Sequence, residues 1–329
     1  MNNTTKSQVC NVQSGTIFTG KWHKNSYKIV RPLGNGANGI VYLAESLKGL
    51  VALKISENSM SITSEVNVLK HFSRVQGSAL GPSFVDVDDW IRQGRNVPFY
   101  VMEYIKGETF LSFIEKRGQE WTGILCLQLL SDLERLHHEG WVFGDLKPDN
   151  LIVTGHPPKI RCIDVGGTTG IGRSIKEFTE FFDRGYWGGG SRKAEPSYDL
   201  FAVAMIIINS AYPKRFPRVD GTNGIEHLKG VIESNHVLKK YRTVLINTIS
   251  GHYQLASEMR QDLVLSMSKP TVTATTQTRQ SRQTSNRGRS THQTRIKRKK
   301  QKSGGLSETI LILTVVFLGY ILYIYGQLL

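Results

Sequence analysis

Apolar and polar positions alternate along much of the first hundred residues, and further along the chain the apolar positions recur at helical spacing. The alternating segments are rich in β-branched residues and are separated by Gly or Asn, as in strands joined by hairpins. The other segments place apolar residues three or four positions apart, as along one face of a helix. This order predicts an α+β protein with a small β-rich lobe followed by a larger helical lobe. We expect strands at 27–34, 39–46, 51–56 and 98–105, and helices at 62–72, 111–117, 124–140, 199–209 and beyond 225.

Two stretches near the end of the chain depart from this pattern. The first is rich in Ser, Thr, Gln and Arg with almost no large apolar residue, so it cannot offset the entropy cost of ordering and is predicted to be a linker. The second, 309–329, carries no charge, and as a helix it would span about 31 Å, close to the apolar thickness of a bilayer. The expected division is a tail at 1–18, a folded domain at 19–265 with lobes at 19–105 and 106–265, a linker at 266–305 and a membrane helix at 306–329.

The positive charge of the chain is concentrated in one tract. The sequence has 42 Lys and Arg against 27 Asp and Glu, a formal net charge of +15. Ten of the basic residues fall within 279–302, which contains no acid, so the rest of the chain is close to neutral. The positive-inside rule keeps this flank on the cytoplasmic side and predicts a single-pass, tail-anchored membrane protein with its folded body and linker in the cytoplasm. A buried C-terminal helix is the alternative for 309–329.

The cysteines exclude two common kinds of small scaffold. Cys10, Cys126 and Cys162 are odd in number and widely spaced, and no C-x-x-C pair is present. A disulfide framework and a cysteine zinc site are therefore not expected, and a reducing compartment fits best. The first fifteen residues lack the apolar stretch of a secretory signal peptide.

A Gly-rich turn and a lysine form the first candidate site. Gly34, Gly36 and Gly39 fall between two predicted strands, where the backbone can lie close over phosphate groups. In a dinucleotide-binding fold such glycines would open a helix, which this pattern does not support; an ordinary Gly-rich hairpin is the alternative. Lys54, on the next strand, needs a counter-charge if it is buried, and Glu65 on the predicted helix is the expected partner. A solvated strand lysine is the alternative for Lys54.

The loop at 143–151 concentrates polar chemistry in a short stretch. Asp145 can accept the proton of a hydroxyl group, and Lys147 can neutralise a phosphoryl group in transit. Asn150 can bind a hard cation through its side-chain oxygen, and Asp164, after two short strands, can supply a second oxygen ligand. Each segment alone has an ordinary structural interpretation, but their order and spacing together favour a phosphoryl-transfer site.

Taken together, these segments resemble the signature motifs of the protein-kinase family over about residues 27–265. Lys147 within DLKPDN is the Ser/Thr-type form, since tyrosine kinases usually lack a lysine there, and the closer match is to bacterial Hanks-type Ser/Thr kinases. Within that group the likeness is closest to kinases of spore-forming Bacillus-type bacteria, which join a kinase domain, a basic linker and a C-terminal anchor. The resemblance implies ATP with Mg²⁺ or Mn²⁺, protein Ser/Thr hydroxyls as acceptors, autophosphorylation, and a role in sporulation or DNA-related signalling.

The resemblance also implies a role for each matching residue. The three glycines would cover the ATP phosphates, Lys54 would hold the α- and β-phosphates while pairing with Glu65, and Asp145 would be the catalytic base. Residues 102–105 look like the hinge that hydrogen-bonds adenine, and Asp199 looks like the acid at a helix start that braces the catalytic loop. The implied nucleotide-binding set is Gly34, Gly36, Gly39, Val41, Ala52, Lys54, Glu103 and Ile105; the catalytic set is Asp145, Lys147, Lys54 and Glu65; and the metal ligands are Asn150 and Asp164.

Three motifs depart from the family pattern. Gly144 replaces the Arg that would hold an activation-loop phosphate, so phosphorylation of that loop is not expected to be an obligatory switch. Val165 replaces a Phe while Phe143 replaces a His, which would move aromatic bulk across one contact at roughly constant core volume. Glu195 is the only candidate for the acid that closes the activation segment, but no Arg stands near 251–253 to pair with it, so a structural role for it is not expected. The activation-loop hydroxyls in question are Thr168, Thr169, Ser174 and Thr179.

The basic tract at 279–302 has three interpretations: a solvated flank that only sets topology, a surface for anionic lipid, and a surface for DNA. Because no aromatic residue lies between 269 and 306, DNA binding would be sequence-tolerant and driven by the phosphate backbone. Eleven Ser or Thr residues between 271 and 294 would allow autophosphorylation to cancel this charge. A pseudokinase that tethers DNA or lipid to the membrane is the alternative to an enzyme, and the oligomeric state stays open.

Overall fold

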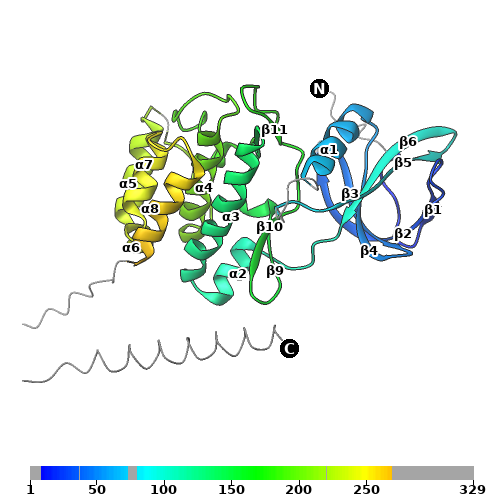
Figure 1. The fold of residues 1–329 in the computed structure, drawn as a ribbon, viewed down its shortest axis with the longest axis horizontal. Coiled ribbons are helices and arrows are strands. Elements are labelled where there is room, and N and C mark those ends of the chain that lie inside the picture. Colours follow the sequence, from blue (N-terminus) through cyan, green and yellow to red (C-terminus); the bar gives the residue numbers. More distant parts are fainter. Residues whose placement is uncertain (1–8, 37, 73–79, 220, 269–329) are drawn as a thin grey trace, which may run out of the picture. The chain divides into compact units, whose positions relative to one another are not determined.

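The computed structural model describes residues 9–36, 38–72, 80–219 and 221–268, which form two lobes (Figure 1). The N-terminal lobe is a six-stranded antiparallel sheet in the order β1-β2-β3-β4-β6-β5, with one helix, α1, packed on it. The first four residues of β2 alternate exposed and buried, as the pattern of apolar positions predicts, whereas β4 and β6 contain runs of consecutive buried residues. The elements are β1 (Ile17–Thr19), β2 (Ser26–Gly36), β3 (Gly39–Ser46), β4 (Gly49–Ile55), α1 (Ser59–Phe72), β5 (Phe84–Arg92) and β6 (Arg95–Glu103).

The C-terminal lobe is mainly helical, and α4 lies at its centre. Thirteen of the sixteen residues of α4 are buried, because this helix is apolar on almost every face and α3, α7 and α8 surround it. The elements of this lobe are β7 (Glu108–Thr109), α2 (Phe110–Arg117), α3 (Glu120–His138), β8 (Trp141–Val142), β9 (Leu151–Thr154), β10 (Lys159–Cys162), β11 (Thr169–Gly170), α4 (Pro196–Ala211), α5 (Gly224–Ser234), α6 (His236–Lys239), α7 (Arg242–Ile249) and α8 (Ala256–Ser268), with 3₁₀ turns at Pro148–Asn150 and Glu180–Phe182.

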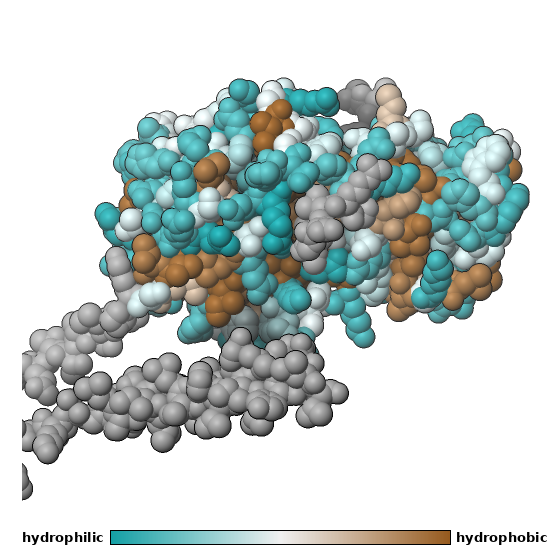
Figure 2. All heavy atoms as spheres, in the orientation of Figure 1, coloured by the Kyte–Doolittle hydropathy of each residue, from teal (hydrophilic) through white to brown (hydrophobic). Residues whose placement is uncertain are grey.

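One apolar cluster runs from the sheet and α1 into the helices of the second lobe. Phe143 and Val165 both belong to it and are almost fully buried, and the exchange of aromatic bulk between these two positions stays a prediction. On the face drawn in Figure 2, hydrophilic side chains predominate and the hydrophobic ones form separate patches. The two-lobe architecture expected from the sequence is therefore confirmed.

Strand β5 was not among the predicted strands, and its buried acids explain why. Asp86 and Asp88 are buried on its inward face. The inward positions of this strand are therefore polar, and its sequence lacks the alternation of apolar and polar residues that marks a strand. The Asp86 carboxylate accepts a hydrogen bond from the Tyr27 hydroxyl (2.7 Å) and lies 2.6 Å from Nδ1 of His23, while Asp88 accepts from the His23 amide (2.7 Å). These two carboxylates hold the turn at 20–25 against the sheet, which satisfies their buried oxygens.

The expected tail at 1–18 is wrong for its last ten residues. Cys10 and Val12 are each 4% exposed and belong to the apolar cluster inside the β-sheet lobe. The Tyr42 hydroxyl donates to the Cys10 carbonyl and accepts from the Val12 amide, both at 2.9 Å. A single buried turn of chain with two small apolar side chains is too short to produce a periodic pattern, so the sequence alone did not reveal it.

At the other end the last helix continues past the expected boundary at residue 265. α8 ends at Ser268. In its last turn, the hydroxyls of Ser266 and Ser268 donate hydrogen bonds to the backbone carbonyls of Leu263 and Val264. The basic tract and the predicted membrane helix at 306–329 lie outside the described residues. Within the part of the chain that the structure describes, none of the helices has the length and apolarity needed to cross a bilayer.

Candidate active site

The centre of the N-terminal lobe holds a buried ion pair. Nζ of Lys54, on β4, lies 2.8 and 2.6 Å from the two carboxylate oxygens of Glu65 on α1, as the sequence predicted. Two further donors, which the sequence reasoning missed, complete the Glu65 carboxylate: the hydroxyls of Tyr100 (2.7 Å) and Ser61 (2.8 Å). Burial, followed by the charge of Glu65, raises the pKa of Tyr100 well above its usual value. A buried pair is favourable only when its hydrogen bonds are satisfied, and this arrangement keeps the Lys54 ammonium fixed in the cleft.

Across the cleft, the catalytic loop brings a carboxylate and an ammonium together. Asp145 is 8% exposed, and its Oδ2 accepts from Nζ of Lys147 at 2.5 Å. The Thr179 hydroxyl, from the segment before α4, donates to Asp145 Oδ1 (3.2 Å) and accepts from Lys147 (3.1 Å). Asn150 donates its side-chain amide to the Asp145 carbonyl (3.1 Å), which fixes the turn between them. The loop therefore presents an oriented carboxylate with a cation at its side.

Asp199 holds the backbone of the loop that carries Asp145. It is fully buried in the first turn of α4, and it accepts hydrogen bonds from the backbone amides of Phe143 (2.8 Å) and Gly144 (2.9 Å). Nε2 of His137 lies 2.9 Å from the same carboxylate. The bracing role expected for Asp199 is thus present in the structure.

The unusual Gly144 has a steric reason. Its φ is +85°, and a Cβ at this position would lie 2.7 Å from the carbonyl oxygen of Gly167. A side chain here would need both a strained backbone and displacement of the neighbouring loop. The local backbone conformation therefore excludes an Arg, or any other side chain, at position 144.

The two predicted metal ligands lie beside Asp145. Asn150 is 8% exposed and its backbone carbonyl accepts from the Ile163 amide (3.0 Å), which places Asp164 next to it. Asp164 is exposed, and its Oδ1 accepts from the Gly166 amide (2.9 Å). The side-chain oxygens of this pair fit a hard cation such as Mg²⁺, which usually takes one or two carboxylates together with substrate phosphates. Within the described ranges, no group of three or more His, Cys, Asp or Glu residues is arranged to hold a metal.

The glycines lie in a hairpin, not at the start of a helix. Gly34 pairs with Val41 and Gly36 pairs with Gly39 across strands β2 and β3. Gly39 has a φ of +128°, and a Cβ there would lie 2.3 Å from the Ile55 carbonyl oxygen, so only glycine fits this approach. Val41, two residues after the turn, lies opposite Lys54 in the β3–β4 ladder, so the turn is close in register to the lysine of the ion pair.

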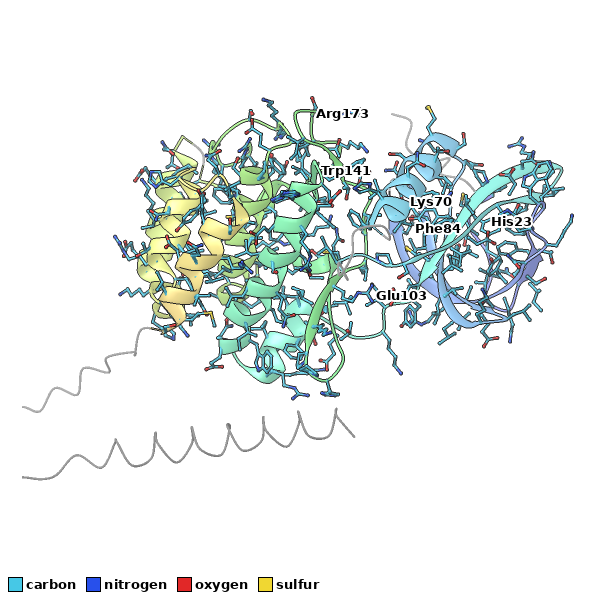
Figure 3. The ribbon with its side chains drawn as sticks, viewed as in Figure 1. His23, Lys70, Phe84, Glu103, Trp141 and Arg173 are labelled. Atoms are coloured by element: carbon cyan, nitrogen blue, oxygen red, sulfur yellow. The ribbon has the colours of Figure 1, made fainter. Side chains whose placement is uncertain are left out.

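The predicted adenine-binding residues lie at the junction of the lobes. Ala52 is buried in the apolar cluster that Val41 also contacts, and Ile105 is 8% exposed. Glu103, labelled in Figure 3, points its carboxylate toward Arg161, whose guanidinium donates to it at 2.6 and 2.9 Å. This hydrogen bonding from Arg161 holds the pKa of Glu103 below its usual value. The side chain of Glu103 therefore ties the hinge to β10, and the nucleotide-binding roles of these residues stay predictions.

Comparison with known proteins agrees with this geometry. Residues 27–284 match the protein kinase domain family. The chain is 52% identical over 335 aligned residues to the serine/threonine-protein kinase YabT of Bacillus subtilis strain 168, and the alignment covers 98% of each chain. This chain is a serine/threonine protein kinase. The family resemblance predicted from the motifs is thereby confirmed. The protein kinase family uses ATP and a divalent cation.

One further relative agrees with this assignment, and one solved structure agrees with the fold. The kinase is 27% identical to the probable serine/threonine-protein kinase YbdM of Bacillus subtilis, over 73% of this chain and 88% of YbdM. Its fold matches a structure of vaccinia related kinase 3 with a TM-score of 0.55 at 16% identity, covering 78% of this chain and 90% of the other. At that identity the second match supports the fold alone.

The activation segment of the kinase ends on a buried acid that the sequence reasoning missed. Asp183 is 1% exposed and accepts from the Tyr198 hydroxyl (2.9 Å), Nε of Arg192 (2.8 Å) and the backbone amides of Gly185 and Tyr186. With these partners Asp183 ties the segment before α4 to the helix itself. The signal in the sequence was the Asp-Arg-Gly triplet that begins at 183, since Asp favours turns in which its carboxylate caps the following amides.

Glu195, which was not expected to have a structural partner, does have one. Its carboxylate pairs with Nη2 of Arg184 at 3.0 Å, so the interpretation based on a missing Arg near 251–253 was wrong. The partner comes from the activation segment itself. The Glu195 side chain is 39% exposed, however, so Asp183 is the acid that the fold buries.

Of the four activation-loop hydroxyls, only Ser174 is exposed. Thr168 and Thr169 are buried at 0% and 1%, and Thr179 is bound to Asp145. We expect Ser174→Ala to change kcat/KM less than twofold, and Thr179→Ala to lower it by about tenfold to a hundredfold, because hydrogen bonds to charged groups contribute about 1.5–3 kcal/mol. Steady-state kinetics on a protein substrate measures both.

Thr179→Ser is the matched control, since it keeps the hydroxyl. If Thr179→Ser is as impaired as Thr179→Ala, the hydroxyl contacts are not the reason for the loss. A large loss in Ser174→Ala would instead show that phosphorylation of this loop is required.

A further carboxylate, absent from the predicted set, reaches the same cleft. Glu177, two residues before Thr179, accepts a hydrogen bond from the side-chain amide of Asn38 in the Gly-rich turn. Burial, together with the charge of Asp164, raises the pKa of Glu177.

None of the predicted site residues lines the broad groove of about 980 Å³ between α3, the β9–β10 turn and α8, so that groove is separate from this site.

Proposed function

We propose that this kinase transfers the γ-phosphoryl group of ATP to Ser and Thr hydroxyls of proteins while anchored to the cytoplasmic face of a membrane, and that its basic tract at 279–302 binds DNA. The arrangement of Asp145, Lys147 and Thr179 supports the catalytic part of the proposal. The charge distribution of the sequence supports the rest.

In this proposal each side chain has one task. Asp145 orients the acceptor hydroxyl and takes its proton, since its oxygens are held by Lys147 and Thr179. Lys147 neutralises charge on the group being transferred, and Lys54, fixed by Glu65, binds the phosphates of ATP. Mg²⁺ held by Asn150 and Asp164 would supply further charge neutralisation.

The membrane part rests on 309–329 and on the basic flank before it. The uncharged stretch has the length of a bilayer-spanning helix, and the ten basic residues at 279–302 favour a cytoplasmic position for the chain that precedes it.

The basic tract at 279–302 also offers ten cations to a polyanion. DNA is the polyanion that we favour, because a kinase domain next to such a tract would receive an input signal from the cytoplasm. The roles in sporulation and DNA-related signalling that the family resemblance implies are part of this proposal.

The DNA part is tested by comparing two soluble forms of the kinase, one ending at Gly305 and one ending at Ser268. We expect the longer form to bind plain duplex DNA of any sequence. Its affinity should fall by about 10³-fold or more between roughly 50 and 200 mM salt, because each phosphate contact releases a counterion. The shorter form, which lacks the basic tract, should bind far more weakly at both salt concentrations.

Vesicles with and without an anionic lipid serve as the comparison. Binding to anionic vesicles with no binding to DNA would assign the tract to lipid. Equal DNA binding by both forms, or an affinity that does not respond to salt, would contradict the proposal.

A further inference from the structure

A short segment just before Thr179 reaches three parts of the catalytic cleft. Nζ of Lys176 donates to the Ser64 hydroxyl on α1 (3.2 Å), and Thr179 contacts the catalytic loop. Between them, the carboxylate of Glu177 accepts from Asn38 at the tip of the Gly-rich turn. Glu177 therefore lies between the Gly-rich turn and Thr179, whose hydroxyl contacts Asp145.

The charges around Glu177 are unbalanced. Asp164 Oδ1 and Glu177 Oε2 lie 3.2 and 3.7 Å from the position that a Cβ on Gly166 would take, so the two carboxylates are near neighbours. The nearby ammonium groups are already paired, Lys54 with Glu65 and Lys147 with Asp145. Among the residues that the structure describes, Glu177 makes no ion pair, and its one hydrogen-bond donor, the Asn38 amide, is neutral.

Mg²⁺ held by Asn150 and Asp164 would compensate the charge of Asp164. The half-buried carboxylate of Glu177 would still have no cation of its own, and a substrate could provide one. Acids close to one another repel, and a charged donor makes a hydrogen bond to a carboxylate about twice as strong as a neutral donor does. The guanidinium of Arg can form two parallel hydrogen bonds to one carboxylate. An arginine beside the acceptor residue is thus the complement that this side of the cleft is missing.

We propose that Glu177 is a specificity-determining residue that binds a basic side chain, preferably Arg, next to the Ser or Thr that receives the phosphoryl group. The proposal rests on the proposed kinase function, and it names the class of acceptor for that same site. It adds to Asp145 and Lys147, which act on any hydroxyl, a residue that selects among hydroxyls.

The chain itself contains acceptors of this class. Four hydroxyl residues of its basic tract and the stretch before it stand directly beside an arginine, and no acid occurs between 269 and 306. An acidic side chain close to the catalytic loop and an acid-free, Arg-rich acceptor segment are complementary in charge. Autophosphorylation is therefore expected first at Thr278, Ser281, Ser290 and Thr294.

The test uses two peptides with the sequence of residues 276–287, one natural and one with every Arg replaced by Gln. We expect the wild-type kinase to phosphorylate the natural peptide with a kcat/KM about tenfold or more above that of the Gln peptide. Glu177→Gln should reduce this ratio to near one, and Glu177→Lys should invert the preference toward a peptide with Glu in place of Arg. Glu180→Gln, an exposed acid three residues away, is the matched control and should keep the wild-type ratio.

A wild-type enzyme that does not distinguish the two peptides overturns the proposal without any variant. A ratio that Glu177→Gln leaves unchanged overturns it as well, and if the KM for ATP or the Mg²⁺ requirement shifts instead, Glu177 acts on the nucleotide. These outcomes are distinct from a failure of the kinase function itself, which would appear as no transfer to any peptide or to casein by the wild-type chain.

Discussion

Replacing Asp145 by Asn is expected to lower kcat by about 10²- to 10⁴-fold, the usual contribution of a positioned general base. The substitution keeps the shape of the side chain and one oxygen that can still accept from Thr179. It removes the charge that holds Lys147 and the capacity to take the proton of the acceptor hydroxyl. Transfer of labelled phosphate from ATP to a protein substrate at saturating ATP measures the loss.

Two further measurements separate a catalytic effect from a structural one. The substituted amide side chain would remain in a folded loop, so ATP binding and the urea midpoint of unfolding should stay near the wild-type values. Asp149→Asn, four residues away on the same loop, is the control: its carboxylate is 61% exposed and pairs with Arg215, so kcat should change less than twofold. Retention of more than a tenth of the wild-type kcat by Asp145→Asn would remove Asp145 from the role of base.

The parts of the site that the sequence predicted are those where charge must be compensated. A lysine on a buried strand needs an acid, and only a few acids are placed to reach it, so the pair of Lys54 and Glu65 follows from patterning alone. The hydroxyls of Tyr100 and Ser61, which complete that pair, stand in an ordinary strand and helix and carry no sequence signal. Neutral donors can lie at many positions at little cost, so their partners are visible only once the fold is known.

The errors in the fold have a common cause, which is burial that apolar patterning does not show. Strand β5 buries Asp86 and Asp88 and was missed, since buried carboxylates look like surface residues in a sequence. For the same reason the sequence pointed to Glu195, and not to Asp183, as the acid that closes the activation segment. The partners of Asp183, Arg192 and Tyr198, lie within fifteen residues of it. A buried acid is stable only with several donors, and those donors are assembled by tertiary structure.

The basic tract and the uncharged stretch at 309–329 differ from these cases. Their interpretation depends on net charge and length, which the sequence gives directly and which need no packing to be read. The kinase domain has the opposite character, since its site depends on contacts between residues far apart in the chain, such as Asn38 and Glu177, which are 139 positions apart.

Replacing Asp199 by Asn is expected to lower both the stability and the activity of the kinase. Asp199 is fully buried, and its two oxygens accept from the amides of Phe143 and Gly144, with His137 at 2.9 Å. The Asn side chain has one acceptor oxygen and an NH₂ group that would face a buried donor. Leaving buried donors unsatisfied costs about 1–3 kcal/mol each, so we expect a loss of about 2–5 kcal/mol in the free energy of unfolding, measured by urea denaturation.

The activity of Asp199→Asn should fall even where the protein is fully folded, because the amides that it releases belong to the loop carrying Asp145. This separates it from Asp145→Asn, which should lose activity without losing stability. The measurement is kcat at low temperature in the folded range of the urea curve, with Glu195→Gln as control, since Glu195 lies at the start of the same helix but is 39% exposed. If Asp199→Asn matches the wild type in kcat once folded, Asp199 stabilises the lobe but does not position the catalytic loop.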